Sequence, residues 1–188
     1  DCPSRLREWL FHFAGRGGMD IEHLCYKTID LLIGEGFISD PGDIFTFDVD
    51  SLMGRDGWGE ISVSNLRAAI EAARDRSAAR LLTALGIRHV GATVARVLLA
   101  AFGGLPTLLD ATDEEISAVE GIGPVIAAGV WEWSRDPVNR ELVRKLGDAG
   151  VRLADEADER AASDLLSGAT FVVSGKLDGI SREEAQIA

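Results

Sequence analysis

Apolar side chains recur every three or four positions in three stretches of the 188-residue chain. This period is typical of helices that bury one face and leave the other in water. Each stretch follows a short turn that ends in glycine, at Gly59, Gly91 and Gly123. The predicted buried faces comprise Val63, Leu66, Ala69, Ile70 and Ala73 after the first turn, Val94, Val97, Leu98 and Ala101 after the second, and Val125, Ile126, Gly129, Val130 and Trp133 after the third.

The three turns are regularly spaced along the chain. They read Gly57-Trp58-Gly59, His89-Val90-Gly91 and Gly121-Ile122-Gly123, and their last glycines are 32 residues apart. Pro124 follows the third turn and suits the start of a helix, where its missing N–H has no intrahelical acceptor. A fixed interval of this kind indicates a repeated unit, here a helix, a tight turn and a second helix.

A weaker copy of the unit precedes these three. Residues 20–38 show the same apolar spacing, but His23 and Cys25 stand at the positions of the two turn glycines. Cys25 lies 34 residues before Gly59. We therefore expect four units arranged as two tandem pairs, in an all-α fold. The apolar positions of the first unit are Ile21, Leu24, Ile29, Leu32 and Ile33.

The composition, 46% hydrophobic and 27% charged, is that of a folded chain. The longest uncharged apolar run, residues 97–109, is 13 residues long, so neither a membrane span nor a membrane partner is expected. Two cysteines, Cys2 and Cys25, cannot form a disulfide framework or a four-ligand zinc site. A cytoplasmic location is the default, and Cys25 is interpreted as a small buried residue.

The net charge of −12 argues against a protein that coats nucleic acid through bulk positive charge. The charge is uneven, however: −7 for residues 1–60, +4 for 61–109 and −9 for 110–188. Arginine suits phosphate, although a charged stretch is also typical of a solvated helix face. The positive charge of the middle segment comes from Arg67, Arg74, Arg76, Arg80, Arg88 and Arg96.

The turns predict a chemistry of backbone amides. The first N–H groups of a helix have no intrahelical acceptor and lie at the positive end of the helix dipole, so they form an anion site. Glycine lets such a backbone approach a phosphate closely, although the same glycines could merely turn and cap helices. Because DNA offers phosphates at regular intervals, several such turns can hold a duplex without reading its sequence. The predicted DNA contacts are Gly57, Gly59, Arg88, His89, Gly91, Thr93, Gly121 and Gly123.

Several longer stretches carry a family resemblance that covers essentially the whole chain. They are CPSRLREWLFHFAGRGGMDIEHL, RLLTALGIRHVG, AVEGIGPVIAAGV, DPVNRELVRKLGDAGVRL and FVVSGKLDGISREEA. In this combination the chain resembles the tandem helix-hairpin-helix region of bacterial NAD-dependent DNA ligases. The resemblance implies the end of a zinc-finger region with a connecting helix at 1–19, four hairpins at 20–153, an acidic linker at 154–165 and the truncated start of a BRCT domain at 166–188.

The resemblance also implies what this segment lacks. Cys2 is similar to the last of four zinc cysteines of the family, but the other three are absent, so the segment is expected to hold no zinc. Family members join AMP from NAD to the lysine of a Lys-x-Asp-Gly motif and seal nicks with magnesium. These letters occur here only at residues 176–179, within the stretch that resembles the start of a BRCT domain and not an adenylation domain. We therefore expect no catalytic residue and no bound cofactor in this segment, which should be inactive alone.

The role implied for the segment is to grip nicked double-stranded DNA, as a monomer, during replication and repair. Two other interpretations of the function stay open. One is a helical scaffold whose hairpins bind protein. The other is a different helix-hairpin-helix protein that binds DNA junctions, which would share the hairpins but not the flanking stretches.

Overall fold

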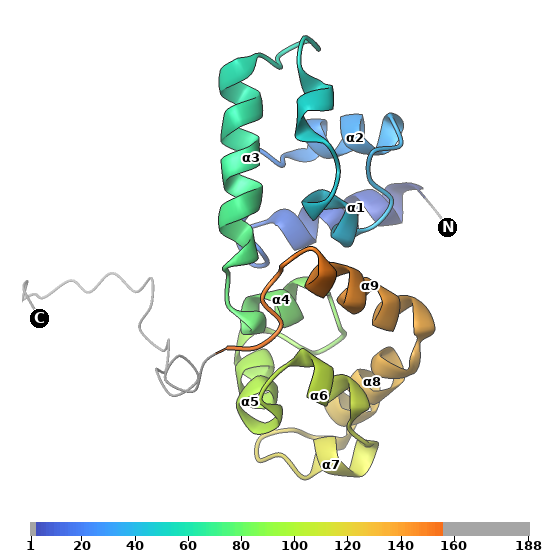
Figure 1. The fold of residues 1–188 in the computed structure, drawn as a ribbon. Coiled ribbons are helices and arrows are strands. Elements are labelled where there is room, and N and C mark those ends of the chain that lie inside the picture. The colour runs from blue at the N-terminus through green and yellow to red at the C-terminus, as the bar shows by residue number, and fades with distance from the viewer. Residues whose placement is uncertain (1–2, 156–188) are drawn as a thin grey trace, which may run out of the picture.

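A computed structural model describes residues 3–155, and this part of the chain is entirely helical (Figure 1). The all-α prediction is confirmed there. Cys2, most of the predicted linker and the predicted β-α piece at 166–188 lie outside the described residues. The elements are α1 (Pro3–Ala14), α2 (Tyr26–Gly34), the 3₁₀ helices η1 (Pro41–Phe45) and η2 (Val49–Leu52), α3 (Glu60–Arg74), α4 (Ala78–Ala84), α5 (Ala92–Phe102), α6 (Leu105–Asp110), α7 (Asp113–Ser117), α8 (Pro124–Arg135) and α9 (Pro137–Asp148).

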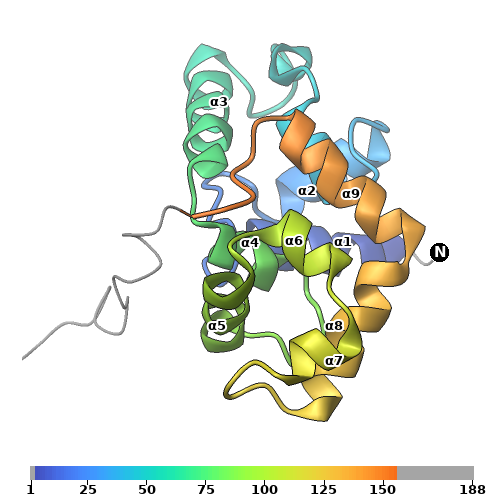
Figure 2. The same cartoon turned by 60° about the horizontal axis from the view of Figure 1, so that its bottom comes forward.

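The helices form two parts that pack on one another. The first part contains α1, α2, both 3₁₀ helices and α3, and the second contains α4 to α9. Figures 1 and 2 show α9 at the junction, where it contacts η1 of the first part. Buried side chains form one hydrophobic cluster that extends through both parts, so the two predicted pairs share a single core.

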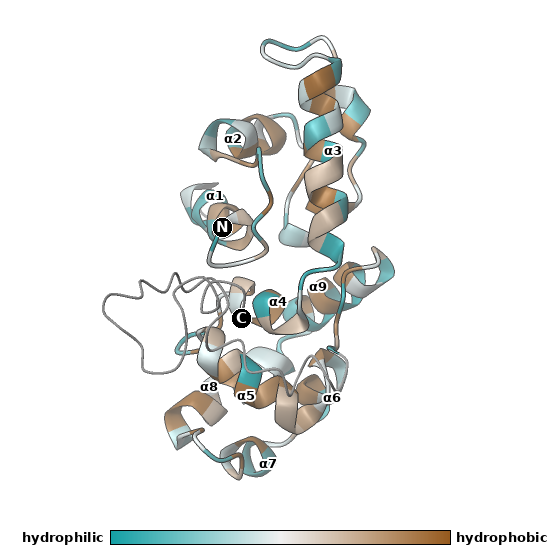
Figure 3. Ribbon diagram, turned by 90° about the vertical axis from the view of Figure 1, so that its left-hand side faces the viewer, coloured by the Kyte–Doolittle hydropathy of each residue, from teal (hydrophilic) through white to brown (hydrophobic). Residues whose placement is uncertain are grey.

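The predicted buried faces agree largely with the structure. Leu66 and Leu98 are fully buried, as are the small residues Ala95 and Ala127, which let neighbouring helices approach closely. In Figure 3 hydrophobic and hydrophilic segments alternate along α3, as expected when one helix face is buried. Val125 and Ala101 are exceptions: both are exposed, and the side chain of Val125 is 68% exposed. Val125 is the second residue of α8 and therefore lies on a first turn that extends beyond the core.

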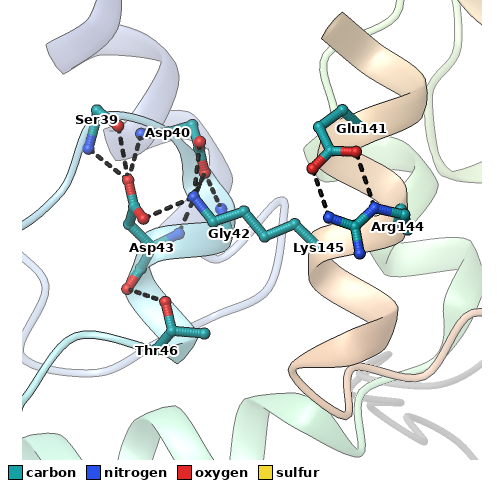
Figure 4. Close-up of polar contacts among 8 residues, drawn as sticks. All are labelled: Ser39, Asp40, Gly42, Asp43, Thr46, Glu141, Arg144 and Lys145. Carbon is teal, nitrogen blue, oxygen red and sulfur yellow. Dashed lines mark hydrogen bonds and ion pairs between the residues drawn. The ribbon is translucent and has the colours of Figure 1, made fainter. Parts of the chain in front are cut away.

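A partly buried ionic cluster joins α9 to η1 (Figure 4). Lys145 donates to both carboxylate oxygens of Asp40, at 3.0 and 2.8 Å, and to Asp43 Oδ1 at 2.6 Å. Asp40 also accepts from the amides of Gly42 and Asp43 and so caps η1. Asp43 in turn accepts from the amide and hydroxyl of Ser39, at 2.8 and 2.7 Å. The three charged side chains thus fix the orientation of the second part relative to the first.

The end of the described chain folds back against the second part. Asp155, the second residue of the predicted acidic linker, accepts hydrogen bonds from the first amides of α4, those of Ala78 at 2.7 Å and Ala79 at 3.3 Å. A carboxylate at the start of a helix is stabilised by the helix dipole. In residues 3–155 no helix is long and apolar enough to cross a membrane.

Candidate nucleic-acid interface

Four tight turns share one backbone conformation. They occupy residues 21–25, 55–59, 87–91 and 119–123, and we number them hairpins 1 to 4. In each, the amide of the fourth residue donates to the carbonyl of the first, at 3.4, 2.9, 3.0 and 3.0 Å. The third residue has a positive φ in all four, at 70°, 79°, 67° and 84°. This combination matches a type II β-turn. The third residues are His23, Gly57, His89 and Gly121.

Hairpin 1 adopts this conformation without the usual glycines. His23 has φ 70°, a region that costs a non-glycine residue free energy. Ile21 and Leu24 flank it and are both buried, so packing of the turn against the core stabilises the conformation. The weak sequence copy is therefore a complete fourth repeat in the backbone, and the expectation of four units is met.

The fifth residue of each hairpin caps the helix that follows. Cys25, Gly59, Gly91 and Gly123 all have extended backbones, and none makes a side-chain capping hydrogen bond to the helix. A Cβ atom at any of these three glycines would meet no atom within 4 Å, and none of the three has a positive φ. Packing and backbone geometry therefore do not demand glycine at these positions. The space in front of the first-turn amides is open.

The hairpins differ in how many amides they leave free. In hairpin 3 the first three amides of α5 have no intrahelical acceptor. In hairpin 4 the first residue of α8 is proline, and the amide of Ile126 donates to the carbonyl of Gly123 at 3.0 Å. In hairpin 2 the hydroxyl of Ser62 accepts from the amide of Gly59 at 2.9 Å. Hairpin 3 therefore offers more free backbone donors than hairpins 2 and 4.

Most of the predicted basic middle segment has a structural role, which corrects the sequence-based interpretation. Four of its six arginines are engaged within the protein: Arg67 with Asp50, Arg74 with Glu71 and the carbonyl of Phe45, Arg76 with Asp20, and Arg80 with the carbonyls of Gly18 and Arg16. Arg88 and Arg96 form no ion pair with the described residues. Arg88 is exposed within hairpin 3, so the charge available to a ligand concentrates there.

Hairpin 3 differs from the other three hairpins in the charge of its second residue. Arg88 occupies it in hairpin 3, whereas the other hairpins carry exposed acids, Glu22, Asp56 and Glu120. His89, Gly91 and Thr93 are also exposed and belong to the same turn and the first turn of α5. Hairpin 3 thus brings together four of the predicted contacts, while Gly57 and Gly59 lie in hairpin 2 and Gly121 and Gly123 in hairpin 4.

A groove of about 690 Å³ extends from hairpin 3 onto α1. Arg5 and His12 of α1 line it together with His89 and Gly91. The Nε2 atom of His12 lies 3.4 Å from the carbonyl oxygen of Thr83. Sequence reasoning missed Arg5, and no local signal could reveal it, because the fold brings it next to a turn more than 80 residues away.

The hairpins also pair as the sequence predicts. His23 of hairpin 1 lines a shallow groove together with Gly59 of hairpin 2 and Ile61 of the following helix, α3. A Cβ atom at Gly129 of α8 would lie 3.9 Å from the carbonyl oxygen of Arg88, so the helix after hairpin 4 packs beside hairpin 3. A larger groove of about 1010 Å³ adjoins the groove at hairpin 3, with which it shares Arg5 and Trp9. It lies between α1 and α9 and has a mainly apolar lining that includes Trp133, Val138 and Leu142.

Cys25 is exposed at the start of α2, so its interpretation as a buried residue is wrong. Its Sγ atom lies 3.5 Å from the hydroxyl of Thr28. Hydrogen bonding from the side chain and the backbone amide of Thr28 lowers the pKa of the Cys25 thiol, since it outweighs the opposing effect of burial. Among residues 3–155 no three His, Cys, Asp or Glu side chains come together as a metal site.

The lowered pKa of Cys25 predicts early alkylation as pH rises. A free cysteine thiol has a pKa of about 8.5. In a protein with Cys2 replaced by serine, the rate of Cys25 alkylation by iodoacetamide should rise with pH, and the midpoint of this rise should lie below that value. Thr28→Val removes the hydroxyl and should move the midpoint upward. Equal midpoints in the two proteins would contradict the assigned cause.

Together the helices and the four turns define a helix-hairpin-helix fold. Residues 80–143, which contain hairpins 3 and 4, match the family described as helix-hairpin-helix motif. The expected likeness to DNA ligases is confirmed over 98% of the chain. Identity is 42% over 186 residues to the DNA ligase of Halothermothrix orenii, 41% over 184 to that of Chloroflexus aurantiacus and 38% over 184 to that of Chloroflexus aggregans. The chain spans 28%, 26% and 27% of these relatives, about a quarter of their length.

Proposed function

We propose that residues 20–153 bind nicked double-stranded DNA without sequence preference, as the DNA-gripping part of a ligase. One observation carries the proposal: four turns of one conformation each end in an extended residue, three of which are glycines that face open space. Since folding does not require glycine there, a ligand that approaches the backbone closely explains the choice. First-turn amides of a helix suit phosphate oxygens, and DNA supplies phosphates in series.

Few charged side chains of the protein then contribute to DNA binding. With a net charge of −12, the chain as a whole repels DNA, so contacts must be local and short. Amides at a helix start provide such contacts, and Arg88 adds a cation without an ion-pair partner among the described residues, whereas Arg55 of hairpin 2 pairs with Glu35. Hairpin 3 is therefore the principal contact, and hairpins 2 and 4 contribute fewer or partly satisfied donors. Gly57 and Gly121 serve mainly as the positive-φ residues of their turns.

The chemistry of nick sealing is assigned to other parts of the ligase. The only Lys-x-Asp-Gly sequence of the chain, at residues 176–179, falls in the stretch that resembles a BRCT domain, so we assign to the chain no step of AMP transfer from NAD and no magnesium site. Zinc does not fit the residues present: Cys2 is a single candidate ligand, and a structural zinc site needs about four. We infer that the chain positions the nick for a catalytic centre elsewhere in the parent enzyme.

Arg88→Gln tests the ionic part of the contact. We expect binding to a nicked duplex to weaken about tenfold at 0.1 M salt, because a charged hydrogen bond to phosphate is lost. The slope of log affinity against log salt should become shallower by about 0.9, with no change in sequence preference. Fluorescence anisotropy across a salt series measures both quantities.

Arg67→Gln is the matched control, because Arg67 is exposed but already paired with Asp50. Its salt slope should equal that of the wild type. A salt-independent complex, or equal slopes in all three proteins, would contradict phosphate binding by hairpin 3. Binding of a protein partner with no binding of duplex would instead favour the scaffold reading.

A further inference from the structure

Two large aliphatic side chains are exposed at equivalent positions of the repeat. Ile61 is 79% exposed and Val125 is 68% exposed. Each is the second residue of the helix that follows its hairpin, α3 after hairpin 2 and α8 after hairpin 4. Single exposed apolar residues need no explanation, but recurrence at one position of a repeat does. At the same position hairpins 1 and 3 carry the polar residues Lys27 and Thr93.

The second residue of the following helix therefore alternates between polar and aliphatic from one hairpin to the next. Hairpins 2 and 4 combine an exposed aliphatic residue with an exposed acid in the turn, Asp56 or Glu120. Hairpin 3 instead combines Arg88 with Thr93, and no acid occupies its turn. Figure 1 shows the turns of hairpins 2 and 4 at opposite ends of the molecule, with hairpin 3 between them. The ionic contact is thus central, and the two apolar contacts are at the ends.

We propose that Ile61 and Val125 pack against deoxyribose rings of the bound duplex. This inference rests on the proposed function, since the amides of the same helical turn hold the neighbouring phosphate. The carbon face of a deoxyribose adjoins every phosphate along a strand, so a side chain within the turn that binds the phosphate lies beside a sugar. Apolar side chains are a common means of contact along the minor groove. Asp56 and Glu120 disfavour a second phosphate at these turns, whereas an uncharged sugar face is tolerated.

Apolar and ionic contacts differ in their response to salt, and the test uses this difference. Ile61→Ala, Val125→Ala and the double variant are compared with Val138→Ala. Val138 is the matched control, because it is 72% exposed and lies on α9, outside the hairpins. Arg88→Gln is the ionic reference. Each protein is titrated with nicked duplex by fluorescence anisotropy at several salt concentrations, after circular dichroism confirms unchanged helix content.

We expect each hairpin variant to bind about fivefold more weakly and the double variant about 25-fold, from loss of buried apolar area at independent sites. Their salt slopes should equal that of the wild type, while Arg88→Gln alone has a shallower slope. Wild-type affinity in the hairpin variants, a shallower slope in them, or an equal loss in Val138→Ala would overturn the inference. Absence of wild-type binding to the duplex would overturn the proposed function itself.

Discussion

Replacing Gly91 with aspartate is expected to weaken binding to a nicked duplex by about 10- to 100-fold, from the loss of charged hydrogen bonds to phosphate. The new side chain fits, because a Cβ atom there meets nothing within 4 Å and φ is −95°. Aspartate is also a preferred N-cap residue, so it would accept hydrogen bonds from the amides of α5 and satisfy them internally. Helix content and Tm should therefore stay the same or rise while affinity falls. Anisotropy and thermal unfolding followed by circular dichroism measure the two effects.

Two variants at the same position separate blocking from charge. Gly91→Ala adds a methyl group without a hydrogen-bond acceptor and should lose little affinity. Gly91→Asn caps the same amides without a charge and should fall between alanine and aspartate. DNA binding by Gly91→Asp as tight as that of the wild type would contradict phosphate binding by the first-turn amides of α5, and so would losses of affinity in the three variants that only follow their losses of Tm.

The second large effect concerns the ionic cluster at the junction. Lys145→Met keeps the aliphatic stem that packs on Gly42 but removes the ammonium group from Asp40 and Asp43. Two neighbouring carboxylates are then left half-buried and without a cation. We expect the free energy of unfolding to fall by about 2 kcal/mol, less than for a fully buried pair because the groups keep some exposure. Urea denaturation monitored by circular dichroism measures it.

The effect of Lys145→Met should depend on pH. Burial alone would raise the pKa of Asp43, but hydrogen bonds from Lys145 and Ser39 outweigh it and lower that pKa below the ordinary value. Burial alone would lower the pKa of Lys145, but hydrogen bonds to Asp40 and Asp43 raise it. The stabilisation is therefore lost as pH falls through the folded pKa of Asp43 and as it rises through that of Lys145. Between about pH 5 and 9 the difference from the wild type should be constant.

Arg144 provides the control for this prediction. It is the neighbour of Lys145 on α9 and pairs with Glu141 and Asp148, but both ion pairs are exposed (Figure 4 shows the one with Glu141). Exposed pairs contribute little, so Arg144→Met should leave the unfolding midpoint almost unchanged. Equal destabilisation by the two substitutions, or none by Lys145→Met, would contradict the proposed role of the cluster.

The repeated architecture could be predicted from the sequence because its signals are local. Apolar spacing and the interval between Gly59, Gly91 and Gly123 depend only on neighbouring residues, and the structure follows them closely. The backbone conformation of hairpin 1 could not be predicted from the sequence in the same way. His23 occupies a left-handed position that sequence reasoning reserves for glycine, and only the burial of Ile21 and Leu24 explains why it does so.

Ion pairing could not be predicted, because it depends on contacts across the fold. Arg80 binds the carbonyl of Gly18, and Arg76 pairs with Asp20, so residues more than 50 positions apart decide which arginines are free. The basic middle segment therefore looked like a phosphate surface although most of its arginines stabilise the protein. The exposure of Val125 could not be predicted either. Its spacing is that of a buried face, but α8 begins only one residue before it.

The most direct test of the hairpin account is an amide map of the bound state. In ¹H–¹⁵N correlation spectra recorded with increasing amounts of nicked duplex, the largest shifts should fall on the amides from Gly91 to Val94. Smaller shifts are expected at the first turns of α3 and α8, and free and bound spectra should show the same helix content. Shifts confined to the apolar groove between α1 and α9, or no shifts at hairpin 3, would contradict the account.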